Sequence, residues 1–145
     1  MNKHYLIGIV LALAGLLAAC QPAAPTAGGS ANPDDIVLSW HREGGIAGFC
    51  DDLTITAGGE VTATSCMGRE GGMVASAQLD ATQQAQLEQW VGTLGAFEVE
   101  QSDDAVADSM TVGLTFKGRG SGTPNAATEQ ALLDFAGMLY AALAQ

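Results

Sequence analysis

Basic residues are scarce in this sequence, which has 5 Lys and Arg against 16 Asp and Glu and a formal net charge of −11. Proteins that bind nucleic acid gain much of their affinity by neutralising phosphates with Lys and Arg. The scarcity of cations therefore argues against nucleic acid as a partner, and also against adhesion to anionic lipid by charge. An acidic surface of this kind more often keeps a protein soluble than steers a partner.

Cysteine and histidine are also rare, with 3 Cys and 2 His in the chain. A zinc site needs more such ligands than are present. Asp103, Asp104 and Asp108 lack the oxygen-rich spacing of a calcium loop and are typical of a solvated acidic turn. A glycosidase-like pair of carboxylates is an alternative, but nothing in the sequence selects one pair among the many Asp and Glu residues. We therefore expect no metal, no cofactor and no enzymatic activity.

Apolar residues form one long run, and it lies at the N-terminus. Met1–Tyr5 is polar with one cation, and Leu6–Leu17 is apolar. The run is too short to span a bilayer, which needs about 20 apolar residues. A charged start, an apolar middle and small residues before a cleavage point are typical of a signal peptide. An ordinary secretory signal followed by a chance cysteine at position 20 is one interpretation.

The sequence Leu17-Ala18-Ala19-Cys20 resembles the bacterial lipobox. The resemblance implies that residues 1–19 are a lipoprotein signal peptide and that Cys20 carries diacylglycerol. Each buried methylene of an acyl chain contributes about 0.8 kcal/mol, so more than one chain anchors a protein stably. Gln21 replaces the aspartate that often signals inner-membrane retention, which favours the outer membrane in a host with two. We expect a cell-envelope protein facing the periplasm or the exterior.

Residues 20–33 are rich in Ala, Pro, Gly and Ser and show no apolar periodicity. Such a composition predicts a disordered tether that follows the lipidated cysteine. Residues 34–145 are then enough for one domain with a single core.

Cys50 and Cys66 remain after lipidation, and an even pair in an exported chain suggests a disulfide. Residues 51–56 and 60–65 read as two strands, joined by a three-residue loop whose last residue, Gly59, takes positive φ. Following the pairs away from this loop brings the two cysteines opposite each other, at a separation that a disulfide can bridge. The bond should stabilise the domain by roughly 3 kcal/mol. Two buried free thiols are the alternative.

The remaining pattern predicts a two-layer α+β domain with an antiparallel sheet of four to five strands and two helices packed on one face. Asp80 and Gln83 form a capping box for the first helix, and Gly95 is its expected stop. Thr123 and Pro124 are the expected start of the second helix. Further strands are predicted at 36–41, 97–101 and 110–117, with a weaker one at 73–78.

The glycine-rich loop Lys117–Thr123 lies between a predicted strand and a predicted helix. Its amides and two cations suggest an anion site at the helix N-terminus. The loop lacks the Gly-Lys-Ser/Thr ending of a P-loop, and no further strand follows it. A flexible loop is the preferred interpretation.

The segment that follows the first strand reads Arg42-Glu43-Gly44-Gly45-Ile46-Ala47-Gly48. Its glycines allow positive φ or a close approach to a partner, while Arg42 offers donors and Glu43 an acceptor. The alternative is a tight structural turn with a solvated ion pair. A near copy at residues 69–73 has unrelated flanks, so we interpret it as chance.

This segment resembles the opening of the emfourin family, as does the later order of helix, acidic turn, strand and helix. Emfourins are small bacterial inhibitors of thermolysin-type metalloproteases. The resemblance implies that the partner is a metalloprotease or another envelope protein. It also implies a contact surface formed by Arg42, Glu43, Gly44, Gly45, Ile46 and Gly48. The chain departs from the family in its lipid anchor and its predicted disulfide. An accessory envelope lipoprotein without an enzyme target is the alternative function.

Overall fold

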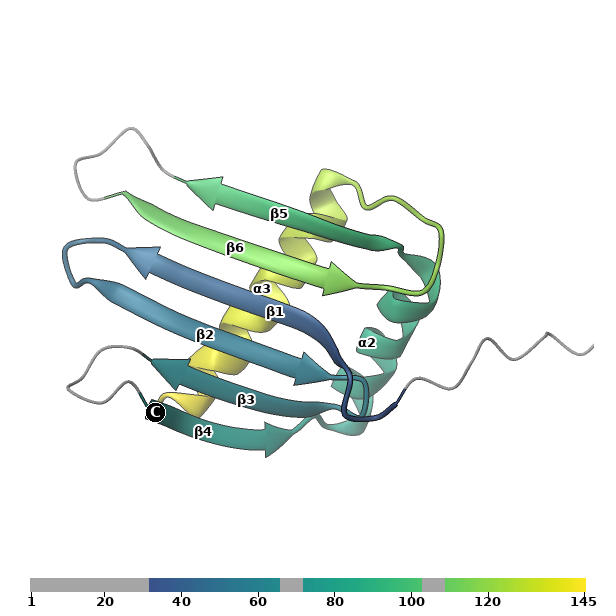
Figure 1. The fold of residues 1–145 in the computed structure, drawn as a ribbon, viewed down its shortest axis with the longest axis horizontal. Helices are drawn as coiled ribbons and strands as arrows, with labels where there is room; N and C mark the ends of the chain where they lie inside the picture. Colours follow the sequence, from purple (N-terminus) through teal and green to yellow (C-terminus); the bar gives the residue numbers. More distant parts are fainter. Residues whose placement is uncertain (1–31, 66–71, 103–108) are drawn as a thin grey trace, which may run out of the picture. The chain divides into compact units, whose positions relative to one another are not determined.

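The computed structural model describes residues 32–65, 72–102 and 109–145. Six antiparallel strands form one sheet in the order β4-β3-β2-β1-β6-β5 (Figure 1). The elements, in chain order, are β1 Ile36–Gly44, β2 Phe49–Thr56, β3 Glu60–Ser65, β4 Gly72–Gln78, α2 Ala81–Thr93, β5 Ala96–Ser102, β6 Met110–Lys117 and α3 Ala126–Leu143.

The predicted α+β class is confirmed, but the predicted count of four to five strands is wrong because the sheet has six. The two weakest patterns, at 73–78 and 97–101, became the edge strands β4 and β5. An edge strand pairs along one side only, so a weak alternation of apolar residues suffices there. The predictions for Cys20, for the tether up to residue 31, for Cys66 and for Asp103, Asp104 and Asp108 lie outside the described residues, as does most of the near copy at 69–73.

The β2–β3 hairpin has the predicted register, running from Asp51 opposite Ser65 to Ile55 opposite Val61. Gly59 takes a φ of 84°, as the three-residue loop requires. Cys50 is next to the Asp51–Ser65 pair, which is the position that the predicted disulfide needs. Because its partner lies outside the described residues, the disulfide stays a prediction.

The sequence patterns predicted the start of α2 correctly and the start of α3 incorrectly. The capping box of α2 is confirmed, since the Asp80 carboxylate accepts from the amides of Thr82 and Gln83. The predicted start of α3 is wrong by two residues. Its N-cap is Asn125, whose side-chain oxygen accepts from the Thr128 amide at 2.9 Å. The side-chain oxygen of Asn125 thus accepts a hydrogen bond from a backbone amide of the first helical turn, which would otherwise lack a partner.

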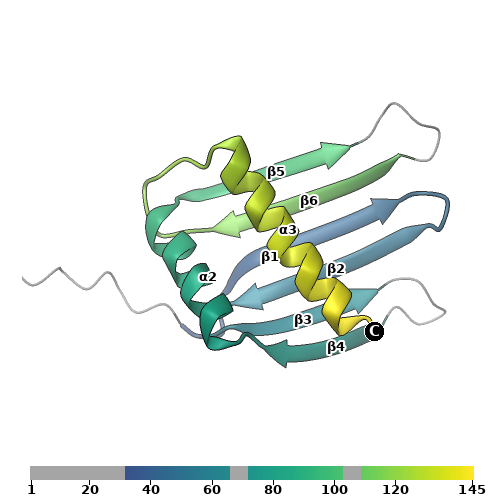
Figure 2. The same ribbon diagram turned by 180° about the vertical axis from the view of Figure 1, so that it is seen from behind.

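Helix α3 crosses the sheet diagonally, whereas α2 lies along one end of it on the same side (Figure 2). The buried apolar side chains of the sheet and both helices form one core. Its largest fully buried members are Phe116, Leu38, Leu53, Ile55, Leu87, Leu132 and Val61. None of the helices in the described part of the chain is long and apolar enough to cross a membrane.

The glycine-rich loop after β6 is hydrogen-bonded to the end of α2, which the sequence interpretation as a flexible loop did not include. The amides of Arg119, Gly120 and Gly122 donate to the carbonyls of Val91, Leu94 and Thr93 at 2.7, 2.8 and 3.0 Å. These carbonyls belong to the C-terminal end of α2, where helical partners run out. The loop therefore caps α2, and three of the amides proposed for an anion are already used.

Substitution by alanine is expected to have opposite effects on stability at Gly120 and at Gly92. A Cβ at Gly120 would lie 2.2 Å from the Thr93 carbonyl, so Gly120→Ala should lower the free energy of unfolding by about 2 kcal/mol. A Cβ at Gly92, in α2, meets nothing within 4 Å, so Gly92→Ala should raise it by up to about 1 kcal/mol. Urea denaturation of both variants checks this, and equal effects would contradict the capping role of the loop.

Candidate functional site

The predicted contact segment forms the end of β1 and the turn to β2. Strand β1 continues to Gly44, beyond its predicted end, and the turn comprises residues 45–48. Gly44, Gly45 and Gly48 take φ values of 95°, 73° and 63°, which side chains rarely tolerate. The Gly45 amide donates to the Ser109 carbonyl at 3.1 Å, and a Cβ on Gly44 would lie 2.3 Å from that oxygen. The glycines thus fix the turn.

Arg42 points to the helix-covered side of the sheet. Its Nε donates to Oδ2 of Asp51 at 3.1 Å, and a second guanidinium nitrogen contacts the same oxygen. Asp51 is 3% exposed, and the Tyr140 hydroxyl donates to its other oxygen at 2.6 Å. These three side chains, the Arg42–Asp51–Tyr140 cluster, join β1, β2 and α3.

Electrostatics within the cluster favour the charged carboxylate. Burial alone raises the pKa of Asp51, but hydrogen bonds from Tyr140, Arg42 and Ser65 and the charge of Arg42 outweigh it, so that this pKa lies below its ordinary value. Burial, and then the hydrogen bond to Asp51, raise the pKa of Tyr140. The cluster therefore keeps an ion pair at neutral pH.

Aromatic rings also lie close to the Arg42 guanidinium. Arg42 lies 4.3 Å from the ring centre of Phe49, 5.7 Å from that of Trp40 and 5.6 Å from that of Tyr140. Each distance is within the range of cation–π attraction. Two of the three guanidinium nitrogens are thus engaged with Asp51 inside the protein. Arg42 stabilises the base of the hairpin, and its contact with a partner stays a prediction.

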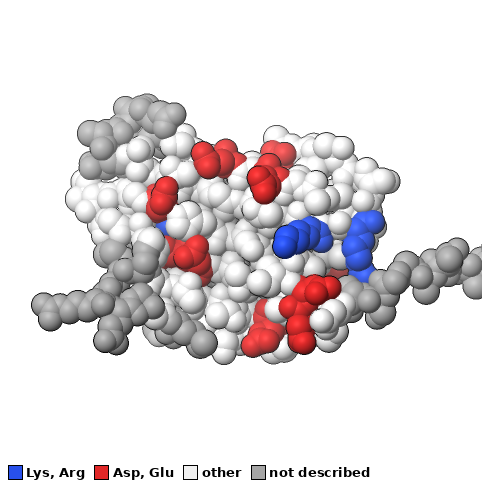
Figure 3. Space-filling model, viewed as in Figure 1, with Lys and Arg blue, Asp and Glu red and all other residues white. Residues whose placement is uncertain are grey.

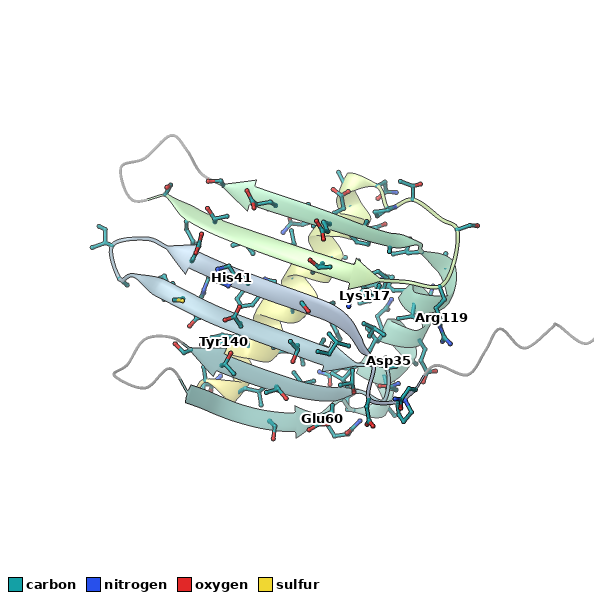
Figure 4. The ribbon with its side chains drawn as sticks, viewed as in Figure 1. Asp35, His41, Glu60, Lys117, Arg119 and Tyr140 are labelled. Carbon is teal, nitrogen blue, oxygen red and sulfur yellow. The ribbon has the colours of Figure 1, made fainter. Side chains whose placement is uncertain are left out.

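Glu43 lies on the opposite, open face of the sheet, because successive strand residues alternate in direction. Its carboxylate is 3.2 Å from Nε2 of His41, and the Asp52 carboxylate on β2 is 2.7 Å from Nδ1 of that ring. Figure 4 shows His41 on the open face and Tyr140 on α3 behind the sheet. The structure therefore separates Arg42 from Glu43, which the sequence analysis had treated as one donor–acceptor pair.

The pKa of His41 is raised from its usual 6.5, mainly by the hydrogen bond to Asp52 and less by Glu43, against a lowering by burial. The group therefore stabilises the fold below about pH 6.5, and this contribution is lost as the pH rises through the folded-state pKa. Because these side chains are well exposed, we expect less than about 1 kcal/mol. His41 is the sole histidine of the chain after residue 19, so its NMR titration is easily followed. An unshifted titration, or equal pH dependence in His41→Gln, would contradict this.

Ile46 is the large apolar residue of the predicted set, and its side chain is exposed to solvent. It is 86% exposed within the turn, and Phe49 at the start of β2 is 37% exposed. An exposed isolated apolar side chain is ordinary on a surface. Here, however, the side chain stands on a turn that is fixed by glycines and by the Arg42–Asp51–Tyr140 cluster.

A second surface is the open face of the sheet, which lies on the side away from α2 and α3 (Figure 1 and Figure 2). It contains a shallow hollow of about 660 Å³, whose polar lining is Ser39, His41, Asp52, Thr54, Thr64, Glu98, Glu100 and Thr115. Figure 3 shows this face as mostly uncharged, with scattered carboxylates and two cations near one end. Within residues 32–65, 72–102 and 109–145, no three His, Cys, Asp or Glu side chains gather as metal ligands.

Comparison of the chain with protein-family models, with curated proteins and with solved structures found no match.

Proposed function

We propose that this protein is a lipid-anchored binding module of the cell envelope that inhibits a thermolysin-type protease through its β1–β2 turn. The observation that carries the proposal is the 86% exposure of Ile46 in that turn. A protease recognises its substrate by pockets that accept single side chains. The turn presents one apolar side chain of the size that such a pocket takes.

The rigidity of the turn supports this role. Three glycines at positive φ shape it, and the bond from the Gly45 amide to Ser109 connects it to the start of β6. The Arg42–Asp51–Tyr140 cluster fixes its base against α3. A contact that is ordered before binding loses less conformational entropy when it binds. The arrangement thus favours affinity.

The position of the turn in the fold also supports it. The predicted tether joins the domain just before Ile36, at the start of β1, and the turn follows Gly44 at the other end of that strand. A nine-residue strand is about 30 Å long. The chain therefore enters the domain at the end of β1 that is remote from the turn.

The arrangement of His41 favours binding over catalysis. Each of its ring nitrogens lies within hydrogen-bond distance of a carboxylate, Asp52 or Glu43. The ring therefore has no nitrogen left to activate a hydroxyl or thiol nucleophile. The accessory-lipoprotein alternative is favoured by the engagement of Arg42 within the fold, and it predicts that no protease responds to Ile46.

The test is a titration of the mature chain, purified oxidised with Cys20→Ser in place of the lipid, against a thermolysin-type protease with a peptide substrate. We expect the residual activity to fall to a stoichiometric end point. Unchanged activity at micromolar concentrations of the chain, with folding confirmed by circular dichroism, would exclude this target. It would favour the accessory lipoprotein, whose partner would be sought by crosslinking in the envelope.

A further inference from the structure

Exposed large apolar side chains are concentrated near the turn. In the described part of the chain they are Ile36, Ile46, Phe49, Met110 and Met138. Phe49 and Met110 each pair with Gly44, from β2 and β6, so they flank the base of the turn. Met138 on α3 is 66% exposed and lines one groove together with Met110. Ile36 is the exception, at the other end of β1.

The groove has a volume of about 560 Å³ and lies between α3 and the neighbouring ends of β1, β5 and β6. It exists because α3 crosses the sheet diagonally and leaves this corner of the apolar face uncovered (Figure 2). Gly137 and Ala141, one helical turn apart, contribute little side-chain volume to its helix wall. A Cβ added at Gly137 would meet nothing within 4 Å, so space remains above the helix.

Trp40 also lines the groove and carries an unsatisfied donor. The residue is 4% exposed, and its indole Nε1 has no hydrogen-bond partner among the described residues. Buried donors without an acceptor are rare and call for an explanation. The rim of the groove is polar and satisfied, because Gln101 donates to Gln130 and Gln130 to Asp134. The groove thus has an apolar wall and a polar rim, and one of its lining residues, Trp40, holds a buried donor without a partner among the described residues.

We propose that this groove is the second half of the partner contact and takes an apolar side chain from an extended segment of the partner, whose backbone carbonyl accepts from Trp40. The proposal rests on the proposed function of the turn. A stable interface buries about 800 Å² on each partner, more than residues 45–48 alone can supply. The apolar surface continues from Ile46 through Phe49 and Met110 to the groove, whereas the open face continues with Glu43, His41 and Asp52.

The first test does not depend on the protease. The mature chain with Cys20→Ser, labelled with ¹⁵N and in its methionine methyls, is titrated with the peptide acetyl-Ala-Leu-Ala-amide to millimolar concentration. We expect saturable shifts of the Trp40 indole signal and of the Met110 and Met138 methyls, with the His41 ring unchanged. Met138→Lys should abolish the shifts, and its exposure makes the substitution compatible with folding.

Two results would overturn the proposal. One is the absence of a shift at Trp40. The other is a set of shifts that depends on the concentration of the protein without peptide, since a second copy would then fill the groove.

The second test uses neighbours that face opposite sides of β6. Met110→Lys should raise the inhibition constant for a thermolysin-type protease at least tenfold, whereas Thr111→Lys, on the open face, should change it less than twofold. Equal effects would overturn the groove contact and leave the proposed function intact. Conversely, saturable peptide binding without any inhibition by the wild-type chain would support the groove and reject only the protease.

Discussion

Ile46→Asp is expected to weaken inhibition of a thermolysin-type protease by at least about 30-fold, because a hot-spot residue at the centre of an interface contributes about 2 kcal/mol or more. The side chain is 86% exposed and makes no contribution to the core, so the free energy of unfolding should stay within about 0.5 kcal/mol of wild type. A carboxylate at this position would have to be desolvated in an apolar pocket. Inhibition constants and urea denaturation curves of the same preparations separate the two effects.

Ile36→Asp is the matched control for this substitution. Ile36 is an exposed apolar residue of the same type, 42% exposed, at the other end of β1. The control should leave the inhibition constant unchanged, since it makes the same change of charge and residue type but far from the turn. If both variants inhibit as strongly as the wild-type chain, the turn is not the contact. If both lose inhibition, net charge and not the turn governs binding.

Asp51→Ala is expected to lower the free energy of unfolding by about 3 to 5 kcal/mol, the usual cost of removing one partner of a buried ion pair. Asp51 is 3% exposed and accepts hydrogen bonds from both Arg42 and Tyr140. Its removal leaves a guanidinium and a phenol hydroxyl without their acceptor at the junction of β1, β2 and α3. Thermal and urea denaturation at neutral pH measure the loss.

Asp52→Ala provides the control, because Asp52 is the next residue but points to the open face. Its side chain is 51% exposed and pairs with His41 there. Exposed pairs contribute at most about 1 kcal/mol, so the expected loss is correspondingly small. Tyr140→Phe should fall between the two, since it removes one hydrogen bond from the buried carboxylate. Equal losses for Asp51→Ala and Asp52→Ala would show that the cluster does not stabilise the hairpin.

The sequence predicts best where neighbours along the chain decide the structure. The β2–β3 register follows from a three-residue loop and alternating side chains, and the capping box follows from Asp80 and Gln83 alone. The strand count was too low, because β4 and β5 pair along one side and need only a weak pattern. The start of α3 was wrong because Asn125 competes with Thr123 as N-cap, and their order of preference is close.

The contacts of the candidate site depend on residues that are distant in sequence. Asp51 and Tyr140 are 89 residues apart, and no local pattern connects them. One local signal was available, however. Extending the alternation of Leu38 and Trp40 by two residues places Arg42 on the core side and Glu43 on the open side. The glycines that follow suggested a loop starting at Arg42, whereas the structure continues the strand to Gly44.

The contact surface as a whole is tested most directly by hydrogen exchange of the mature chain with and without an inactive variant of a thermolysin-type protease. The proposal predicts slower amide exchange in residues 44–49 and in the exposed side of α3 around Met138, with unchanged exchange across the centre of the open face. Protection confined to the open face, or no protection at saturating protease, would contradict the proposal that this protein binds its target through the β1–β2 turn.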